Sequence, residues 1–316
     1  MRHPRYCWIC ATLAMLLIGV GGASGQSAPA GSPSFQQRIE QLARALQDSP
    51  RLKGLTEQQR IDRVEFVVGN TLFILLHELG HVHVSEMHLP VLGREEDEAD
   101  TFAAITLLRI GTSFSQRVLA DASQGWFMND RRDQQTGAKP LYYDEHDLSP
   151  QRAFHIVCLM VGSDPAKFKG IADKAKMPES RQGSCKQEYN KASRSWDSVL
   201  KPYLRAPDQP QTKIDIVYGD AQGDFERFAR AFRAVRMLET VAERSASTFA
   251  WTAPFTLEMV SCNGPNAGWD DETRTVKVCY QLAFDFAELY RAYVPAAPPA
   301  AAVKTAVNQK QKRKTR

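Results

Sequence analysis

The chain has 316 residues, of which 43% are hydrophobic and 24% are charged. This composition is ordinary for a globular protein, and the length suits one large domain or two small ones. The formal net charge is +4, but segments 1–25 and 295–316 hold eight basic residues and no acidic residue. The remainder has 32 basic and 36 acidic residues, so nucleic acid is not expected as a partner of the folded part.

The first residues are typical of a secretory signal. Two arginines precede an apolar stretch over residues 7–20, and residues 23–25 are small, as a cleavage site requires. The apolar stretch is too short for a comfortable membrane span. We therefore expect a signal peptide over 1–25, a linker over 26–34, and a mature protein that is exported, periplasmic or secreted, without a membrane span.

Two helices are expected next. The first covers Phe35–Gln47 with Ser34 as its cap, and the second is a long helix over Ile61–Met87. The apolar middle of the second helix, Phe66–Leu76, has eleven residues and is interrupted by Asn70. It is too short to cross a bilayer and is interpreted as protein core.

The long helix carries an H-E-x-x-H motif at His77, Glu78 and His81, directly after apolar residues. Imidazoles four residues apart share one face of a helix and can converge on a single metal ion. Glu78 projects beside them, close enough to take a proton from a water on that ion. The pattern is typical of zinc hydrolases. The alternative is a core helix with two satisfied, buried histidines.

A catalytic zinc site needs a third protein ligand besides the two histidines. The metzincin pattern would place a histidine six residues after the second one, with a glycine between. Met87 occupies that position, His88 is one residue too late, and Val84 stands in place of the glycine. The metzincin pattern is therefore excluded.

A glutamate on a following helix is the other choice of third ligand. The helix expected at 95–110 begins with E-x-x-A-D, which places Glu96 and Asp100 one turn apart on one face. Asp100 could hydrogen-bond the far nitrogen of a ligand histidine and fix its orientation. The other acidic residues of the first turn are interpreted as solvated groups that the helix dipole favours: Glu95, Asp97 and Glu98.

H-E-x-x-H followed by E-x-x-A-D resembles the gluzincin arrangement of thermolysin-like and CAAX-prenyl-protease-like metallopeptidases. The resemblance implies Glu96 as third zinc ligand and Asp100 as the partner of His77. Roughly residues 35–292 are also similar to a family of secreted bacterial proteins of unknown function that are described as metallopeptidases. This similarity implies a zincin-like α+β fold over 35–294, mostly helical with a small sheet, one Zn²⁺ ion, and a peptide or protein substrate.

A histidine and an arginine lie six residues apart around the start of the helix expected at 150–162. The segment from His146 to Arg152 is similar to a His-Pro-x-x-x-x-Arg element that CAAX-prenyl-protease-like enzymes carry after their third ligand. That resemblance implies that His146 stabilises the oxyanion and that Arg152 braces the site. The alternative is a surface histidine before a helix and an arginine in an ordinary ion pair.

Four cysteines remain after removal of the leader, at positions 158, 185, 262 and 279. Exported chains favour disulfides, so two bridges are expected. Of the three possible pairings we favour Cys158 with Cys185 and Cys262 with Cys279, because each encloses a short segment. Zinc binding by these cysteines is the alternative, and it is weak because none has C-x-x-C spacing.

The rest of the chain is expected to hold helices and a few strands. Phe255–Val260 and Thr275–Tyr280 alternate as strands and are predicted to form a hairpin. Asn266 and Ala267 resemble an Asn-Ala element of the CAAX-prenyl-protease-like enzymes, which implies a substrate-binding edge strand; a plain structural hairpin is the alternative. The other expected elements are helices at 112–130, 186–200, 225–247 and 282–290 and a strand at 213–218.

These observations predict an exported zinc metallopeptidase with Glu78 as general base. The alternative is an inactive, zinc-containing secreted domain that binds a peptide or partner. Intact Glu78 argues against that alternative, because a pure binder has no use for the base. A third possibility, an intracellular regulator, conflicts with the leader. The basic segment 295–316 is interpreted as a disordered tail that could contact a surface.

Overall fold

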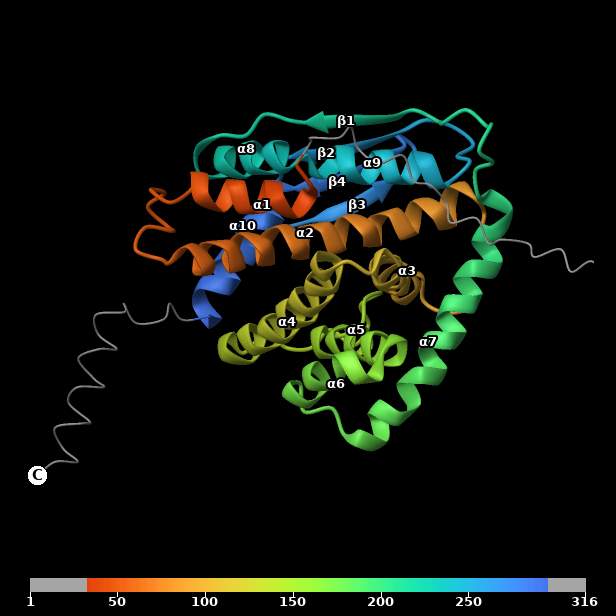
Figure 1. Ribbon diagram of the computed structural model, residues 1–316, viewed down its shortest axis with the longest axis horizontal. Coiled ribbons are helices and arrows are strands. Elements are labelled where there is room, and N and C mark those ends of the chain that lie inside the picture. Colours follow the sequence, from red (N-terminus) through yellow and green to blue (C-terminus); the bar gives the residue numbers. More distant parts are fainter. Residues whose placement is uncertain (1–32, 295–316) are drawn as a thin grey trace, which may run out of the picture. The chain divides into compact units, whose positions relative to one another are not determined.

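The computed structural model describes residues 33–294 (Figure 1). The expected signal peptide, nearly all of the linker and the basic tail lie outside the described residues. The described part is mostly helical with one four-stranded sheet, which is an α+β composition. Its long helices are α1 (Phe35–Ala45), α2 (Glu57–Glu86), α3 (Glu95–Ile110), α4 (Ser113–Thr136), α5 (Ser149–Ser163), α6 (Pro165–Lys174), α7 (Glu179–Leu200), α8 (Glu226–Val235), α9 (Met237–Thr248) and α10 (Tyr280–Tyr293).

Helix α2 is the central element. It has 30 residues and is therefore about 45 Å long. Thr56 caps its start, and a capping box with Gln59 satisfies two of the free amide groups. Every residue from Arg63 to Gly80 is buried, because α1, α3, α4 and α10 all pack around this helix. The H-E-x-x-H motif therefore lies on a helix that is enclosed by the rest of the fold (Figure 1).

The sheet contains β1 (Ile214–Tyr218), β2 (Phe255–Val260), β3 (Ala267–Asp270) and β4 (Thr275–Cys279) in the order β1-β2-β4-β3. The first three strands in this order are parallel, and β3 is antiparallel to β4. Helix α9 packs against β1 and β2, whereas α2 packs against β3 and β4. Helices α4 to α7 lie on the other side of α2 (Figure 1).

The expected hairpin between the strands at 255–260 and 275–280 is wrong. These strands, β2 and β4, are parallel neighbours. A parallel connection needs about a dozen residues or more, and segment 261–274 is long enough to supply one. This segment forms β3, which returns along the outer side of β4 and makes the hairpin with it.

Two other helix predictions are corrected. The helix expected at 225–247 is broken at Arg236, whose φ of 55° is left-handed, so that α8 and α9 are separate. Helix α6 was not expected. Asp164 caps its start, and Pro165 occupies its first turn, where the missing amide hydrogen costs no hydrogen bond within the helix. Helix α7 also starts seven residues earlier than expected.

Disulfides join Cys158 on α5 to Cys185 on α7, and Cys262 to Cys279 at the end of β4. This is the pairing that the sequence favours. The bridges close loops with separations of 27 and 17 residues, so each contributes about 3–4 kcal/mol if it acts on the unfolded chain. Across residues 33–294, no helix combines the length and apolar character needed to cross a membrane.

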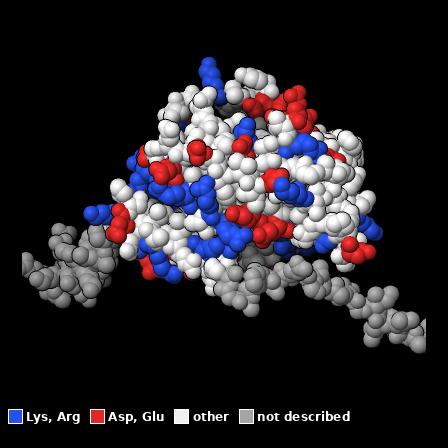
Figure 2. All heavy atoms as spheres, turned by 90° about the horizontal axis from the view of Figure 1, so that it is seen from above, with Lys and Arg blue, Asp and Glu red and all other residues white. Residues whose placement is uncertain are grey.

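Charged side chains of both signs lie side by side on the face of the molecule seen in Figure 2. Exposed ion pairs of the described residues include Arg230 with Glu226 on α8 and Arg236 with Glu243. Exposed pairs of this kind contribute little to stability. The fold therefore depends on its apolar core and its disulfides.

A polar hollow of about 470 Å³, part of it open to solvent, lies between α2, α4 and α10. Asp62, Glu65, Arg117 and Asp121 are among the residues that line it. Burial and the neighbouring Glu65 raise the pKa of Asp121 to about 8, although Arg117 opposes the shift. Asp121 is thus a carboxyl group that the fold keeps protonated at neutral pH.

Replacement of Asp121 by asparagine should stabilise the protein at pH 8 and have little effect at pH 4. The unfolded chain loses the Asp121 proton near pH 3.8, whereas the folded chain keeps it to about pH 8. Wild-type stability therefore falls as pH rises between these values. We expect a gain of about 1–3 kcal/mol at pH 8 from denaturant unfolding. Asp133→Asn on the same helix is the control, and an equal gain at pH 4 would contradict the assignment.

Candidate metal centre

The candidate site is formed where α2 meets α3. His77, Glu78 and His81 lie on consecutive turns of α2, and Glu96 lies in the first turn of α3. The two helices approach closely at Gly80: a Cβ atom there would lie 2.9 Å from Cα of Ala99. Small residues at both positions thus allow the histidines of one helix to face the carboxylates of the other.

Three of the predicted ligand atoms form a compact triangle. Nε2 of His77 lies 3.0 Å from Oε2 of Glu96 and 3.2 Å from Nε2 of His81, and His81 Nε2 lies 3.5 Å from the same oxygen. Ligands at the usual zinc distances are about 3.3 Å apart in a tetrahedron. The triangle therefore has the size that a tetrahedral metal ion requires.

His146 approaches the same oxygen from the segment between α4 and α5. Its Nε2 lies 2.9 Å from Oε2 of Glu96, and His77, Glu96 and His146 form a second group able to hold a metal. The two groups share His77 and Glu96. We favour His77, His81 and Glu96 as ligands, because both histidines are fixed on an enclosed helix, whereas the His146 side chain is 45% exposed and belongs to a loop.

Each of the three histidines has a carboxylate at its other ring nitrogen. Nδ1 of His77 lies 2.8 Å from Asp100, Nδ1 of His81 lies 2.7 Å from Glu95, and Nδ1 of His146 lies 3.2 Å from Asp144. A carboxylate at Nδ1 favours the tautomer with the proton on that nitrogen and leaves Nε2 free as a donor to metal. All three imidazoles thus point their Nε2 atoms toward one place, and each of these atoms can bind a metal once it has lost its proton.

The interpretation of Glu95 as a merely solvated residue is wrong, since it contacts His81 directly. Its position beside Glu96 does not reveal this, because only the meeting of the two helices brings it to the ring. Asp144 was also missed. A local pattern could have identified it, because its carboxylate accepts the backbone N–H of His146 two residues later.

Arg152 lies behind the site and fixes Asp100. It donates two hydrogen bonds of 2.7 Å to the two oxygens of this carboxylate, and its guanidinium stacks on Trp126 at 3.9 Å. Both partners of the ion pair are buried. The chain of contacts from Trp126 through Arg152 and Asp100 to His77 holds the ring in one orientation.

Electrostatics keep the carboxylate of Glu96 charged. Burial raises the pKa of Glu96, but His146, His77 and His81 beside it outweigh burial and hold it far below its ordinary value. Burial likewise lowers the pKa of His81, but Glu96 and Glu95 raise it to about 9. Binding of a metal at Nε2 would therefore release protons from the histidines.

Glu78 is the buried neighbour of this group. It is 6% exposed, and burial raises the pKa of its carboxyl group above the ordinary value, although the nearby imidazoles oppose that shift. A carboxylate with a raised pKa close to a metal site is suited to accept and return a proton.

The residues present fit a metal ion. Oε2 of Glu96 is buried and accepts no hydrogen bond from the residues of 33–294, although three Nε2 atoms lie 2.9–3.5 Å away. Close approach without hydrogen-bond geometry is expected for atoms that share a cation rather than a proton. Imidazole and carboxylate ligands of this kind suit zinc and related divalent metals.

Comparison with known families agrees with this geometry. The DUF4344 family, whose description is "Putative metallopeptidase", matches residues 36–200. The chain belongs to this family. The part that matches DUF4344 contains His77, Glu78, His81, Glu96 and His146, and also the Cys158–Cys185 bridge. It ends before the first strand of the sheet. Neither a curated protein nor a solved structure matches the chain.

Asn266 and Ala267 lie outside the part that matches DUF4344. The carbonyl of Asn266 accepts the N–H of Cys279, and Ala267 is the first residue of β3, opposite Val278. Strand β3 is one of the two edge strands of the sheet and runs beside α2 (Figure 1). One side of β3 is thus bonded to β4, and its other side has no strand partner within the described sheet.

Proposed function

We propose that this protein is an exported, zinc-dependent peptidase in which His77, His81 and Glu96 hold the metal. The observation that carries the proposal is the convergence of histidine Nε2 atoms on Oε2 of Glu96, each imidazole being fixed by a carboxylate at Nδ1. Export is supported by the leader pattern and by two disulfides, which persist in oxidising compartments.

Zinc at this position would supply a Lewis acid that polarises a carbonyl and lowers the pKa of a bound water to about 7. The roles of the protein groups follow from their positions. A carboxylate oxygen of Glu78 takes the proton of the attacking water and later gives it to the leaving amine. Asp100 and Arg152 keep His77 oriented throughout the cycle.

His146 is proposed as the donor that stabilises the oxyanion. Its Nε2 faces the metal-binding atoms from the exposed side, and Asp144 fixes its ring. Ion pairs of Arg94 with Asp97 and Asp147 tie the segment before α5 to the start of α3. Glu96 raises the pKa of this imidazole, which favours a proton on Nε2 that can be donated to charge developing on the substrate carbonyl.

The surroundings of the site support a peptide substrate. Tyr142 and Tyr143 are 82% and 85% exposed, and they lie in the same segment as His146. Leu92, which precedes α3 by three residues, is fully exposed. Exposed apolar side chains in the segments that carry His146 and Glu96 suit contacts with apolar substrate side chains. We propose that β3, starting at Asn266 and Ala267, binds the substrate main chain by strand addition.

Cleavage of a peptide library by the mature protein, followed by mass spectrometry with and without chelator, tests this function. We expect cleavage that is lost with the chelator and restored by zinc. If no peptide is cleaved but some are bound, the protein is instead a catalytically inactive domain that binds peptides or a partner.

Replacement of Glu95 by alanine should weaken zinc binding without abolishing it. The variant loses the carboxylate at Nδ1 of His81 but keeps all three ligands. Loss of such a partner typically lowers metal affinity by about tenfold to hundredfold. Competition with a chromophoric chelator measures the effect, and Glu98→Ala in the same turn is the matched control. Equal affinities of the two variants would mean that Glu95 does not orient His81.

A further inference from the structure

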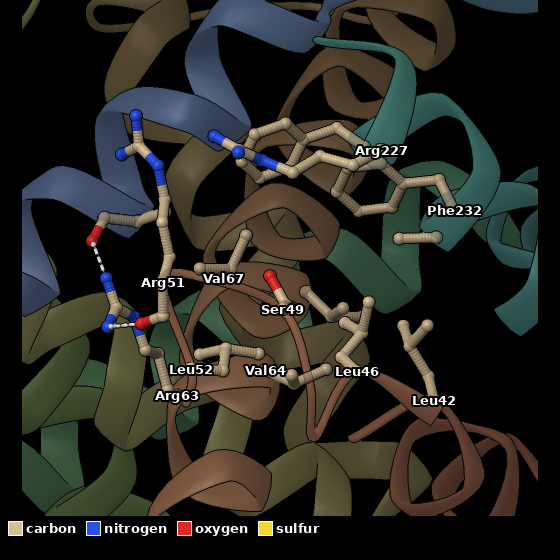
Figure 3. Close-up of a pocket in the computed structure, with 14 residues that line it drawn as sticks. Leu42, Leu46, Ser49, Arg51, Leu52, Arg63, Val64, Val67, Arg227 and Phe232 are labelled. Carbon is tan, nitrogen blue, oxygen red and sulfur yellow. Dashed lines mark hydrogen bonds between the residues drawn. The ribbon is translucent and has the colours of Figure 1, made fainter. Parts of the chain in front are cut away.

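A second hollow lies well away from the metal centre, between α1, α2, α8 and α10. It contains about 650 Å³ of empty space, part of which is open to solvent. Its wall is aliphatic and aromatic, formed by Leu42, Leu46, Leu52, Val64, Val67 and Phe232 among others (Figure 3). Val68 is the lining residue of α2 nearest in sequence to His77 and lies nine positions before it, which is roughly 14 Å along the helix.

One end of this hollow is cationic. Arg51, Arg63 and Arg227 bring their guanidinium groups to it, whereas Leu42 and Phe232 lie at the opposite end (Figure 3). Arg51 and Arg227 both stack on the ring of Phe284, at 5.0 and 6.0 Å from its centre, so their charges lie close together.

The cationic end has fewer acids than arginines. Arg51 pairs with Glu288 and Asp224, and Arg227 uses only Nη1 to reach Asp224. Nη2 of Arg227 is buried and has no hydrogen-bond partner among the described residues. Two carboxylates therefore face three guanidinium groups, and one buried donor of a charged group is unsatisfied.

Arg63 adds to this excess of positive charge. Its side chain is buried, and it donates to the backbone carbonyls of Arg51 and Ala287 rather than to a carboxylate (Figure 3). Burial lowers the pKa of this guanidinium, as expected of a charge that no carboxylate contacts directly. An anion at this end would compensate both Arg63 and Arg227.

We propose that this hollow binds an amphiphile with one carboxylate head and one acyl chain, as in a fatty acid. The carboxylate accepts hydrogen bonds from Nη2 of Arg227, which removes the penalty of an unsatisfied buried donor. The acyl chain of the ligand packs against the apolar wall of the hollow. A peptide fits less well, because Ser49 is the only lining side chain besides the arginines that is polar, and buried amide groups would lack partners.

Calorimetric titration of the full mature protein with dodecanoate, dodecanol and dodecylamine, each below its micellar concentration, tests the proposal. We expect one dodecanoate per chain and at least tenfold weaker binding of the other two. Arg227→Gln should weaken dodecanoate binding by roughly tenfold to hundredfold, since a hydrogen bond to a charged group is lost. Arg230→Gln is the matched control, because Arg230 lies on the same helix but pairs with Glu226 on the surface.

A second variant tests the site without changing a charged residue. Ala231 lines the hollow on α8, so Ala231→Phe should fill it and abolish dodecanoate binding while circular dichroism shows a folded chain. Failure of the wild type to bind dodecanoate, equal binding by Arg227→Gln, or tighter binding of an apolar peptide with a free C-terminus would each overturn the proposal. Glu96→Ala should bind dodecanoate normally, which separates this site from the metal centre.

Discussion

Replacement of Glu96 by alanine is expected to reduce the zinc content of the purified protein from one ion per chain to nearly none. Oε2 of Glu96 is the atom on which His77, His81 and His146 converge, and no other carboxylate of residues 33–294 has this position. The two histidines of α2 cannot complete a site that needs three protein ligands, and His146 belongs to an exposed loop. Atomic absorption or mass spectrometry of the native protein measures the loss.

The controls for this prediction come from the same turn of α3. Glu98→Ala should keep one zinc ion, because the predicted site does not use it, and Glu95→Ala should keep the ion with lower affinity. Thermal unfolding should show that Glu96→Ala is folded, since its side chain does not belong to the apolar core. Full zinc content in Glu96→Ala would remove the assignment of Glu96 and leave His146 as the third ligand to test.

Local patterns were sufficient to predict the two helices that carry the candidate metal ligands. H-E-x-x-H and E-x-x-A-D each place their side chains by helix periodicity alone, and Gly80 and Ala99 are small enough for the two helices to meet. The acidic first turn of α3 also marked its start at Glu95. These features depend on residues close in sequence, which is why they could be predicted.

The features that were missed depend on distant contacts. No glycine or proline marks the break between α8 and α9 at Arg236 in the sequence. The break occurs where the hydroxyl of Tyr218, on β1, accepts a hydrogen bond from the N–H of Leu238. The contact of Glu95 with His81 likewise requires two helices to meet. The parallel pairing of β2 and β4 could not be deduced either, because alternation of apolar residues does not specify strand direction.

Glu78→Gln should keep one zinc ion but lower the rate of peptide cleavage by about 10²-fold or more. Glutamine preserves the size of the buried side chain and removes the group that accepts the proton. Glu78 lies beside the ligands without being one of them, so metal binding and catalysis should separate in this variant. The measurement is the hydrolysis rate of a peptide found in the library, together with the zinc content.

His146→Ala is the informative comparison for this variant. If His146 donates to the oxyanion, its loss should lower turnover by roughly 10² to 10³ while zinc stays bound by His77, His81 and Glu96. If His146 is instead a ligand, the zinc content should fall with the rate. Cleavage by Glu78→Gln as fast as by the wild type would show that the proposed general base is wrong. A residual rate in both variants that the chelator removes would show that the metal acts even without these two side chains.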